Sequence, residues 1–142
     1  VDAPFQFLLV GPTISAFADA FGEGSSGLVT LGHWSPHQDA WPRARPFYDA
    51  YVERFGMRPD YLDTALAYMS LEILEQAVAE VGLDHDKLRE VISSGTFETI
   101  NGPVHFTGVE NDTTPTAFLQ LQDGEMHLVW PASIATADYM PR

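Results

Sequence analysis

The chain has 142 residues, of which 45% are hydrophobic and 12% aromatic, so it is long enough and apolar enough to form a globular domain with a core. Twenty acidic residues against seven basic ones give a formal net charge of −13, which would repel phosphate backbones and argues against nucleic acid as a partner. Cysteine is absent, which excludes disulfides, thiolate metal sites and cysteine nucleophiles.

Two features of the chain concern membranes and processing. The longest apolar stretches, such as residues 7–10 and 28–31, fall far short of the ~20 residues that cross a bilayer. We therefore expect no direct membrane insertion. The sequence begins at Val1, without an initiator methionine or a basic and apolar leader, so we expect that any signal peptide has been removed or never belonged to it.

The first elements predict a strand, a helix and a second strand. Residues 5–10 form an apolar run that ends at Gly11-Pro12, which indicates a buried strand leading into a turn. Thr13 is expected to cap a helix that ends at Gly22, with a second strand over residues 27–34. The apolar side chains of that helix repeat at helical spacing: Ile14, Phe17, Ala18 and Phe21. Such a unit builds parallel sheets.

The middle of the chain predicts helices. Prolines at 36, 42 and 46 keep the segment after the second strand irregular up to about Arg45, because proline lacks a donor and clashes inside a helix. Aromatic residues four apart then predict a helix over about 46–55. A longer helix is expected over 62–81, followed by a third that Asp84 or Asp86 caps and Gly95 ends.

The last third predicts β-structure. Short apolar runs are interrupted at Asn101-Gly102-Pro103 and at Asp123-Gly124, and glycine tolerates the positive φ that tight hairpins need. The fold class is therefore α/β, with a closing β-hairpin region.

Several motifs suggest chemistry but fit a structural role better. Residues 22–27 match G-x-G-x-x-G, yet they follow a helix and precede a strand, which is the wrong context for a dinucleotide site. His33, His37 and Asp39 have the composition of a metal site or of an α/β enzyme, but Pro36 disfavours the helix that would align them. His85, His105 and His127 are dispersed without a paired nucleophile. We expect no catalytic residues, no metal and no cofactor.

Trp34 is the best placed of the tryptophans for binding. It ends a predicted strand and enters an irregular segment, where binding residues tend to lie. A tryptophan there can wall a ligand cleft, although simple packing is the commoner role.

A series of short segments extends along the chain in a fixed order. They are F-x-x-x-Y-x-x-R-F-G at 47–56, P-x-Y-x-x-x-A-x-A-Y at 59–68, L-E-x-A-V at 74–78, K-L-R-x-x-I at 87–92, T-I-N-G-P-V-x-F at 99–106, Q-L-Q-D-G at 120–124 and V-W-P at 129–131. Through these segments the chain resembles the C-terminal part of the type I periplasmic solute-binding proteins, the branched-chain amino acid and amide class that feeds ABC importers.

The resemblance implies a share of a Rossmann-like, three-layer α/β/α fold with two lobes joined by crossing strands. Residues 1–30 would end the second lobe, 31–98 would return to the first lobe as helices, and 99–142 would supply crossing and closing strands of the second lobe. Hinge strands are expected near 28–34, 97–102 and 128–132. The first lobe's N-terminal half would be missing, and uncovered edges favour a homodimer.

The resemblance also implies a function. A small polar solute would be held between the lobes and delivered to the permease of an ABC transporter, by a protein that is periplasmic or anchored outside the cytoplasm as a lipoprotein. The alternative is an extracellular ligand-sensing domain of a receptor or regulator with the same fold. Gly11, Thr13 and Trp34 are the expected ligand-binding residues. Leucine-type members carry an acidic residue after Gly-Pro, where this chain has Thr13, so amides and carboxylates become as suitable as amino acids.

Overall fold

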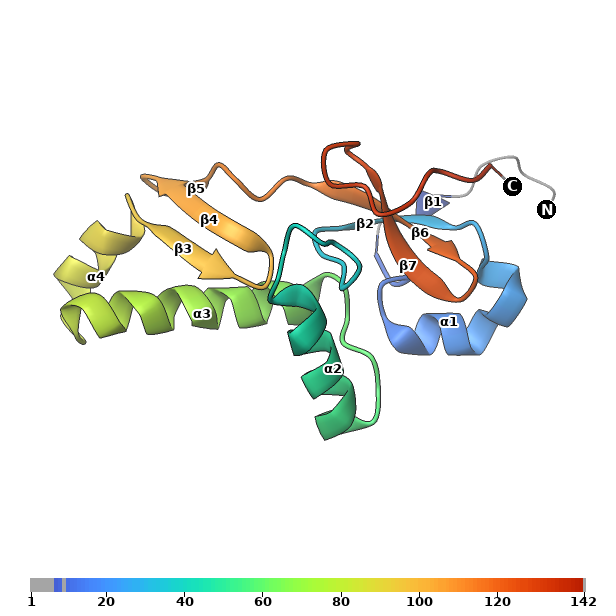
Figure 1. Cartoon of the computed structure of the whole chain (residues 1–142), viewed down its shortest axis with the longest axis horizontal. Helices are drawn as coiled ribbons and strands as arrows, with labels where there is room; N and C mark the ends of the chain where they lie inside the picture. The colour runs from blue at the N-terminus through green and yellow to red at the C-terminus, as the bar shows by residue number, and fades with distance from the viewer. Residues whose placement is uncertain (1–6, 9, 142) are drawn as a thin grey trace.

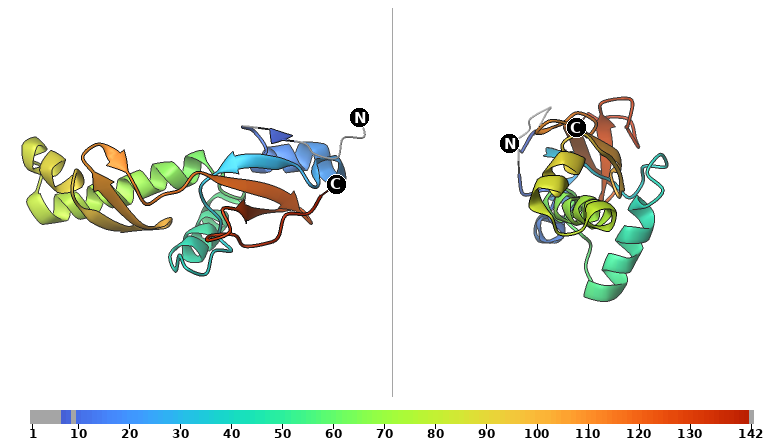
Figure 2. Two further views of the ribbon diagram at one scale, coloured as in Figure 1. Left: turned by 90° about the horizontal axis from the view of Figure 1, so that it is seen from above. Right: turned by 90° about the vertical axis from the view of Figure 1, so that its left-hand side faces the viewer.

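The computed structural model describes residues 7–8 and 10–141. The molecule is elongated (Figures 1 and 2), with one sheet and helix α1 at one end and the long helix α3, α4 and a second sheet at the other. Helix α2 projects between these two parts. None of the helices in the described ranges is both long enough and apolar enough to cross a bilayer.

The first sheet has the strand order β1-β2-β6-β7. Strand β1 (Phe7–Leu8) pairs in parallel with β2 (Val29–Gly32), and helix α1 (Ser15–Phe21) connects them. The predicted strand, helix and strand unit is therefore confirmed. Strand β6 (Ala117–Gln122) pairs with β2 in antiparallel orientation, and β7 (Glu125–Trp130) closes the sheet.

The hairpin between β6 and β7 has the predicted two-residue turn. Gln122 pairs with Glu125, and the intervening Asp123 and Gly124 have φ values of 51° and 83°. Positive φ at both positions matches the right-handed twist of the flanking strands. The Asp-Gly dipeptide therefore located this turn correctly from sequence alone.

The helices of the middle segment lie close to their predicted bounds. Helix α2 covers Ala44–Phe55, α3 covers Asp63–Val81 and α4 covers His85–Ile92. Asp84 caps α4, because its carboxylate accepts hydrogen bonds from the backbone N–H groups of Asp86 and Lys87. Of the two predicted caps, Asp84 is therefore the correct one.

A second, smaller sheet lies along α3 (Figure 1). It contains β3 (Thr96–Thr99), β4 (Gly102–Thr107) and the short β5 (Glu110–Asn111), which the sequence did not predict. A separate core forms between this sheet and α3; its buried members are Met69, Ile73, Ala77, Phe97 and Val104.

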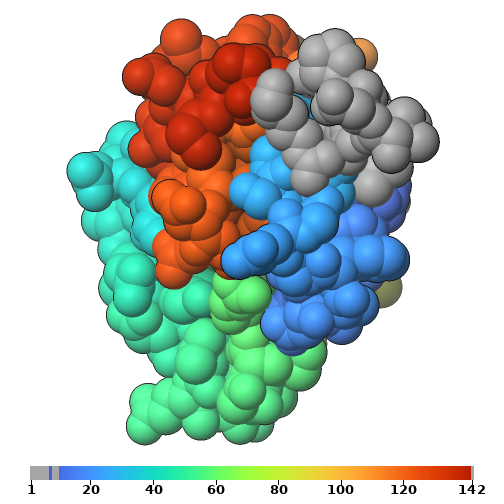
Figure 3. All heavy atoms as spheres, turned by 90° about the vertical axis from the view of Figure 1, so that its right-hand side faces the viewer, coloured from blue at the N-terminus to red at the C-terminus, as the bar shows by residue number. Residues whose placement is uncertain are grey.

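The two faces of β6 explain how the first sheet is covered. Leu119 and Leu121 belong to the larger core, which Ala18 of α1 also contacts. Gln120 and Gln122 point to the opposite face, where their side chains bond the backbone of Met140 and Asp138. The expected three layers are thus completed here by the C-terminal segment rather than by a second helix. Figure 3 shows the red C-terminal residues packed against the orange strands.

Two predicted details at the N-terminus are wrong. The strand predicted over 5–10 was expected to be buried, but Val10 is 65% exposed, and residues 1–6 and 9 lie outside the described residues. Among the described strands, β1 lies at the edge of the first sheet. Thr13 does not cap α1: a turn closed by the Ile14 N–H and the Gly11 carbonyl at 3.0 Å intervenes, and Ile14 becomes the N-cap.

Candidate functional site

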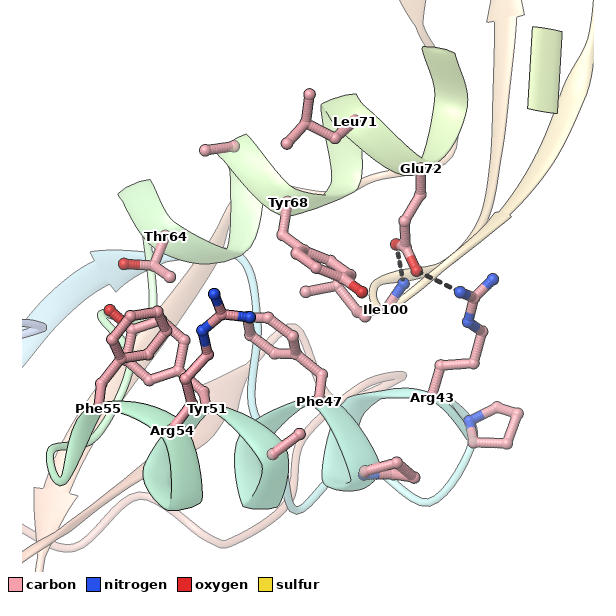
Figure 4. Close-up of a pocket in the computed structure, with 14 residues that line it drawn as sticks. Arg43, Phe47, Tyr51, Arg54, Phe55, Thr64, Tyr68, Leu71, Glu72 and Ile100 are labelled. Carbon is pink, nitrogen blue, oxygen red and sulfur yellow. Dashed lines mark hydrogen bonds and ion pairs between the residues drawn. The ribbon is translucent and has the colours of Figure 1, made fainter. Parts of the chain in front are cut away.

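An open groove of about 790 Å³ lies between α2 and α3 (Figure 4). Its walls are mostly apolar and aromatic. The lining residues from α2 and the segment before it are Pro42, Arg43, Pro46, Phe47, Ala50, Tyr51, Arg54 and Phe55. Those from α3 and beyond are Thr64, Ala67, Tyr68, Leu71, Glu72 and Ile100.

Helical periodicity builds the aromatic wall of this groove. Phe47, Tyr51 and Phe55 are spaced four residues apart on α2, so they share one face. Their ring centroids lie 5.9 Å and 4.5 Å apart along the series. The ring centroids of Phe47 and Tyr68 of α3 lie 4.4 Å apart. Leu71, about one turn further along α3, is 63% exposed. The groove is therefore an open apolar surface held between two helices.

A buried carboxylate closes one end of the groove. Glu72 is 4% exposed, its Oε1 lies 2.6 Å from Arg43 Nη2, and its Oε2 accepts the Ile100 N–H at 2.7 Å. Burial raises the pKa of the Glu72 carboxyl, against the opposing effects of the Ile100 N–H and the Arg43 guanidinium. Arg43 also donates to the Glu98 carbonyl at 3.1 Å. The Glu72 carboxylate and the Arg43 guanidinium thus pair within the protein, and their contacts connect α2, α3 and the β3–β4 turn.

The chemistry of the groove is that of a packing surface. Its described lining contains no serine, histidine or cysteine, so no nucleophile and base are paired there. Glu72 and Arg43 satisfy one another. The groove can therefore bury apolar surface.

The predicted ligand residues Gly11 and Thr13 share one tight turn. Gly11 has φ of 110°, a conformation that favours glycine. Thr13 is 2% exposed, and its Oγ1 has no hydrogen-bond partner among the described residues. The turn therefore carries one buried hydroxyl without a described hydrogen-bond partner, two residues after a glycine with positive φ. Contact of these two residues with a ligand stays a prediction.

Trp34, the third predicted ligand residue, lies inside the larger core. It is 0% exposed, its indole N–H donates to the Ile100 carbonyl at 3.0 Å, and its ring packs against Phe47 and Tyr61. The structure therefore gives Trp34 a packing role that joins β2 to α2 and to the β3–β4 turn. In this arrangement its ring has no accessible face, and its contact with a ligand stays a prediction.

The histidines group differently from the set that the sequence suggested. A ring nitrogen of His33 lies 3.2 Å from the Pro115 carbonyl, whereas His37 contacts Glu125 at 3.0 Å and stacks on His127. Burial lowers the pKa of His127, and the neighbouring His37 lowers it further, against the effects of Glu125 and Asp123. The sequence missed this grouping because tertiary folding brings distant segments together. The only available signal was the i, i+2 spacing of Glu125 and His127 on a strand.

A comparison with models of protein families finds no match for this chain. Comparison with solved structures finds several similar proteins. A leucine binding protein of Thermotoga maritima is 22% identical with a TM-score of 0.64, over 80% of this chain and 33% of that one. A solute binding protein of an ABC transporter from R. palustris, solved in complex with benzoate, is 18% identical with a TM-score of 0.66, over 87% and 34%.

A third similar structure is described as a branched-chain amino acid ABC transporter protein of Silicibacter pomeroyi; it is 24% identical with a TM-score of 0.60, over 95% of this chain and 40% of that one. This chain spans about a third to two-fifths of the length of these proteins. It has the α/β fold of one portion of the type I periplasmic binding proteins, as the resemblance predicted. Two of these neighbours are described as a leucine binding protein and a solute binding protein.

Proposed function

We propose that the chain is the C-terminal share of the substrate-binding component of an ABC importer, which captures a small polar solute between two lobes without acting on it chemically. The observation that carries this proposal is that the structural matches cover unequal shares of the two chains. Similar binding proteins cover most of this chain, whereas the chain covers only about a third of them. A complete ligand cleft then needs residues beyond these 142.

The surface of α3 supports the same conclusion. One side of this helix packs on β3 and β4 through Met69, Ile73 and Ala77. The other side presents Tyr68, Leu71 and Leu74, all exposed. A helix that is apolar on opposite sides belongs inside a larger protein. We take the exposed side, with the groove beside it, as the surface that the remainder of the first lobe covers.

The proposed division assigns each segment of the chain to one of the two lobes. Residues 1–30 and the strands from β6 onward would serve the second lobe, and residues 31–98 would serve the first together with β4 and β5, which pair beside α3. The connections between the two parts of the molecule run through the residues after β2 and through those between β5 and β6 (Figure 1). Of the expected hinge segments, 28–34 adjoins the first connection, whereas 97–102 and 128–132 lie within the two parts. Bending after β2 and between β5 and β6 would let the lobes close on a ligand.

The proposed ligand class is set by the turn at Gly11 and Thr13. Gly11 permits close approach of a ligand, and the unsatisfied Thr13 hydroxyl offers a neutral hydrogen bond. No carboxylate stands at Thr13 to balance an ammonium group. Amino acids, amides and carboxylates therefore all belong in the first screen. The proposed location is the periplasm or another extracytoplasmic position, next to the importer's permease.

A thermal-shift screen of amino acids, amides and carboxylates tests this proposal on two proteins in parallel. The complete parent protein should be stabilised by its solute through mass action, by about 2.7 kcal/mol at a hundredfold excess over the dissociation constant. The 142-residue chain should show little or no shift. Stoichiometric uptake of a solute by the 142-residue chain, or turnover of any compound by the parent, would contradict the proposal.

A further inference from the structure

Two histidines and a glutamate meet at the edge of the first sheet. His37 Nε2 lies 3.0 Å from Glu125 Oε2, and the rings of His37 and His127 stack with centroids 4.8 Å apart. One ligand atom from each residue lies within 4.8 Å of the other two. Within the described ranges this is the one group of three such side chains close enough to share an ion.

The fold fixes this arrangement from both sides. Glu125 and His127 occupy alternate positions of β7, so both side chains project from one face of an edge strand. His37 approaches from the irregular segment after β2. That segment is anchored where the His37 N–H donates to Ser35 Oγ at 3.2 Å and Gln38 Nε2 donates to the Ile134 carbonyl at 2.7 Å. The backbone positions on β7 and the anchored segment after β2 therefore hold the three side chains close together.

We propose that His37, Glu125 and His127 form a binding site for a divalent transition-metal cation of the zinc class. Two imidazoles and one carboxylate are the donor set that zinc takes in three-ligand sites, with a fourth position left for water. Tetrahedral coordination places ligand atoms about 3.3 Å apart. The His37–Glu125 pair is already close to that separation, and half-exposed side chains at a sheet edge can rotate to bring in the third.

Two further observations favour a cation here. His127 Nδ1 is buried and has no hydrogen-bond partner among the described residues, and coordination through that nitrogen would satisfy it. The second observation is electrostatic: Asp123 lies close enough to His127 to act on it and the whole chain carries a charge of −13, while the guanidinium of Arg58 is held by the Gly124 carbonyl at 2.8 Å. A bound cation would fasten the segment after β2 to the β6–β7 hairpin. The site does not depend on the proposed solute-binding function.

Isothermal titration of the metal-free 142-residue chain with Zn²⁺ tests the site. We expect one ion per chain, with affinity lowered at least about tenfold in His37→Ala and in His127→Ala, because even the partners of metal ligands matter by that factor. Substitution with Co²⁺ should give the visible absorption of a tetrahedral ion in the unaltered protein. His33→Ala and His85→Ala are matched controls that leave the three ligands in place and should bind as the unaltered chain does.

Circular dichroism on each variant establishes that it is folded, and Glu125→Gln provides a milder change that keeps size and hydrogen bonding. Loss of binding in the three ligand variants together with retention in the two controls supports the site. Absence of Zn²⁺ binding by the unaltered chain overturns it. Equal binding by the ligand variants also overturns it, because the ion would then be held elsewhere.

Discussion

Glu72 of α3 accepts a hydrogen bond from the backbone N–H of Ile100 at 2.7 Å, where β3 turns into β4. The contact links the longest helix to the tip of the second sheet, and Ile100 in turn accepts the indole N–H of Trp34. A buried carboxylate thus connects the two cores of the molecule through the backbone of a single residue, Ile100. Removal of the Glu72 carboxylate should therefore destabilise both cores.

Glu72→Ala should lower the free energy of unfolding by about 1–3 kcal/mol, because it leaves the Ile100 N–H and Arg43 without their partner. Glu72→Gln should cost less, since an amide oxygen can still accept from Ile100. Urea unfolding followed by circular dichroism measures both. Glu75→Ala, at an exposed position of the same helix, is the matched control and should stay within about 0.5 kcal/mol. An equal loss in Glu72→Ala and Glu75→Ala would contradict the structural role.

The same carboxyl predicts a pH dependence. Burial raises the pKa of Glu72 above its ordinary value of 4.5, so the folded protein keeps the proton to higher pH than the unfolded chain does. The stability that this proton contributes is complete below the ordinary pKa and is lost as the pH rises through the folded-state pKa. Unfolding free energies of the unaltered protein minus those of Glu72→Gln should therefore fall from pH 4 upward. A difference in unfolding free energy that rises with pH would mean that folding lowers the pKa of Glu72 instead of raising it.

Gly102 carries both a conformational and a steric requirement. Its φ is 80°, and an added Cβ would lie 2.7 Å from Trp41 Cδ1. Gly108 has a φ of 67° but open space around it. Gly108→Ala should therefore cost only the backbone term of about 1–2 kcal/mol, and Gly102→Ala should cost about 1–3 kcal/mol more because Trp41 must move. Chemical unfolding with tryptophan fluorescence compares the pair; equal costs would mean that Trp41 yields freely.

Gln120 holds the C-terminal segment against the first sheet. Its Nε2 donates to the Met140 carbonyl at 2.7 Å and its Oε1 accepts the Met140 N–H at 2.9 Å. Gln120→Leu should leave the Met140 N–H and C=O without these partners and raise hydrogen exchange and protease cleavage over residues 136–141. Gln76→Leu removes an amide that bonds the Glu98 backbone instead, so it should leave exchange in 136–141 unchanged. Equal protection of that segment in Gln120→Leu would show that other contacts hold it.

The apolar groove predicts self-association of the 142-residue chain. Leu71 lies exposed beside α2, whereas Leu83 is 80% exposed in the loop before α4, outside the groove. Light scattering after size exclusion should show a dimer that Leu71→Lys converts to a monomer and that Leu83→Lys leaves intact. In the complete parent, Leu71→Lys should instead lower the melting temperature, because a charge would then be buried. A compact monomer of the unaltered chain at all concentrations would contradict the dimer.

Elements with local causes were predictable from the sequence alone. The Asp123-Gly124 turn, the Asp84 cap and the end of α2 at Gly56 each depend on the conformational preferences of one or two neighbouring residues. Apolar periodicity gave the bounds of α3 within a residue or two. The motif segments also gave the fold, because they keep their order along almost the whole chain. Each of these signals is complete within a short window of sequence.

The surroundings of those elements depend on tertiary packing, which the sequence did not reveal. The sequence left Trp34 open between a cleft wall and simple packing, and in the structure it packs in the core, because α2 and the β3–β4 turn close over it. Thr13 was predicted to cap a helix and is instead buried in the preceding turn. His37 meets Glu125 and His127 only because the segment after β2 folds against the edge of β7. Contacts between segments far apart in the chain depend on packing that no short window of residues encodes.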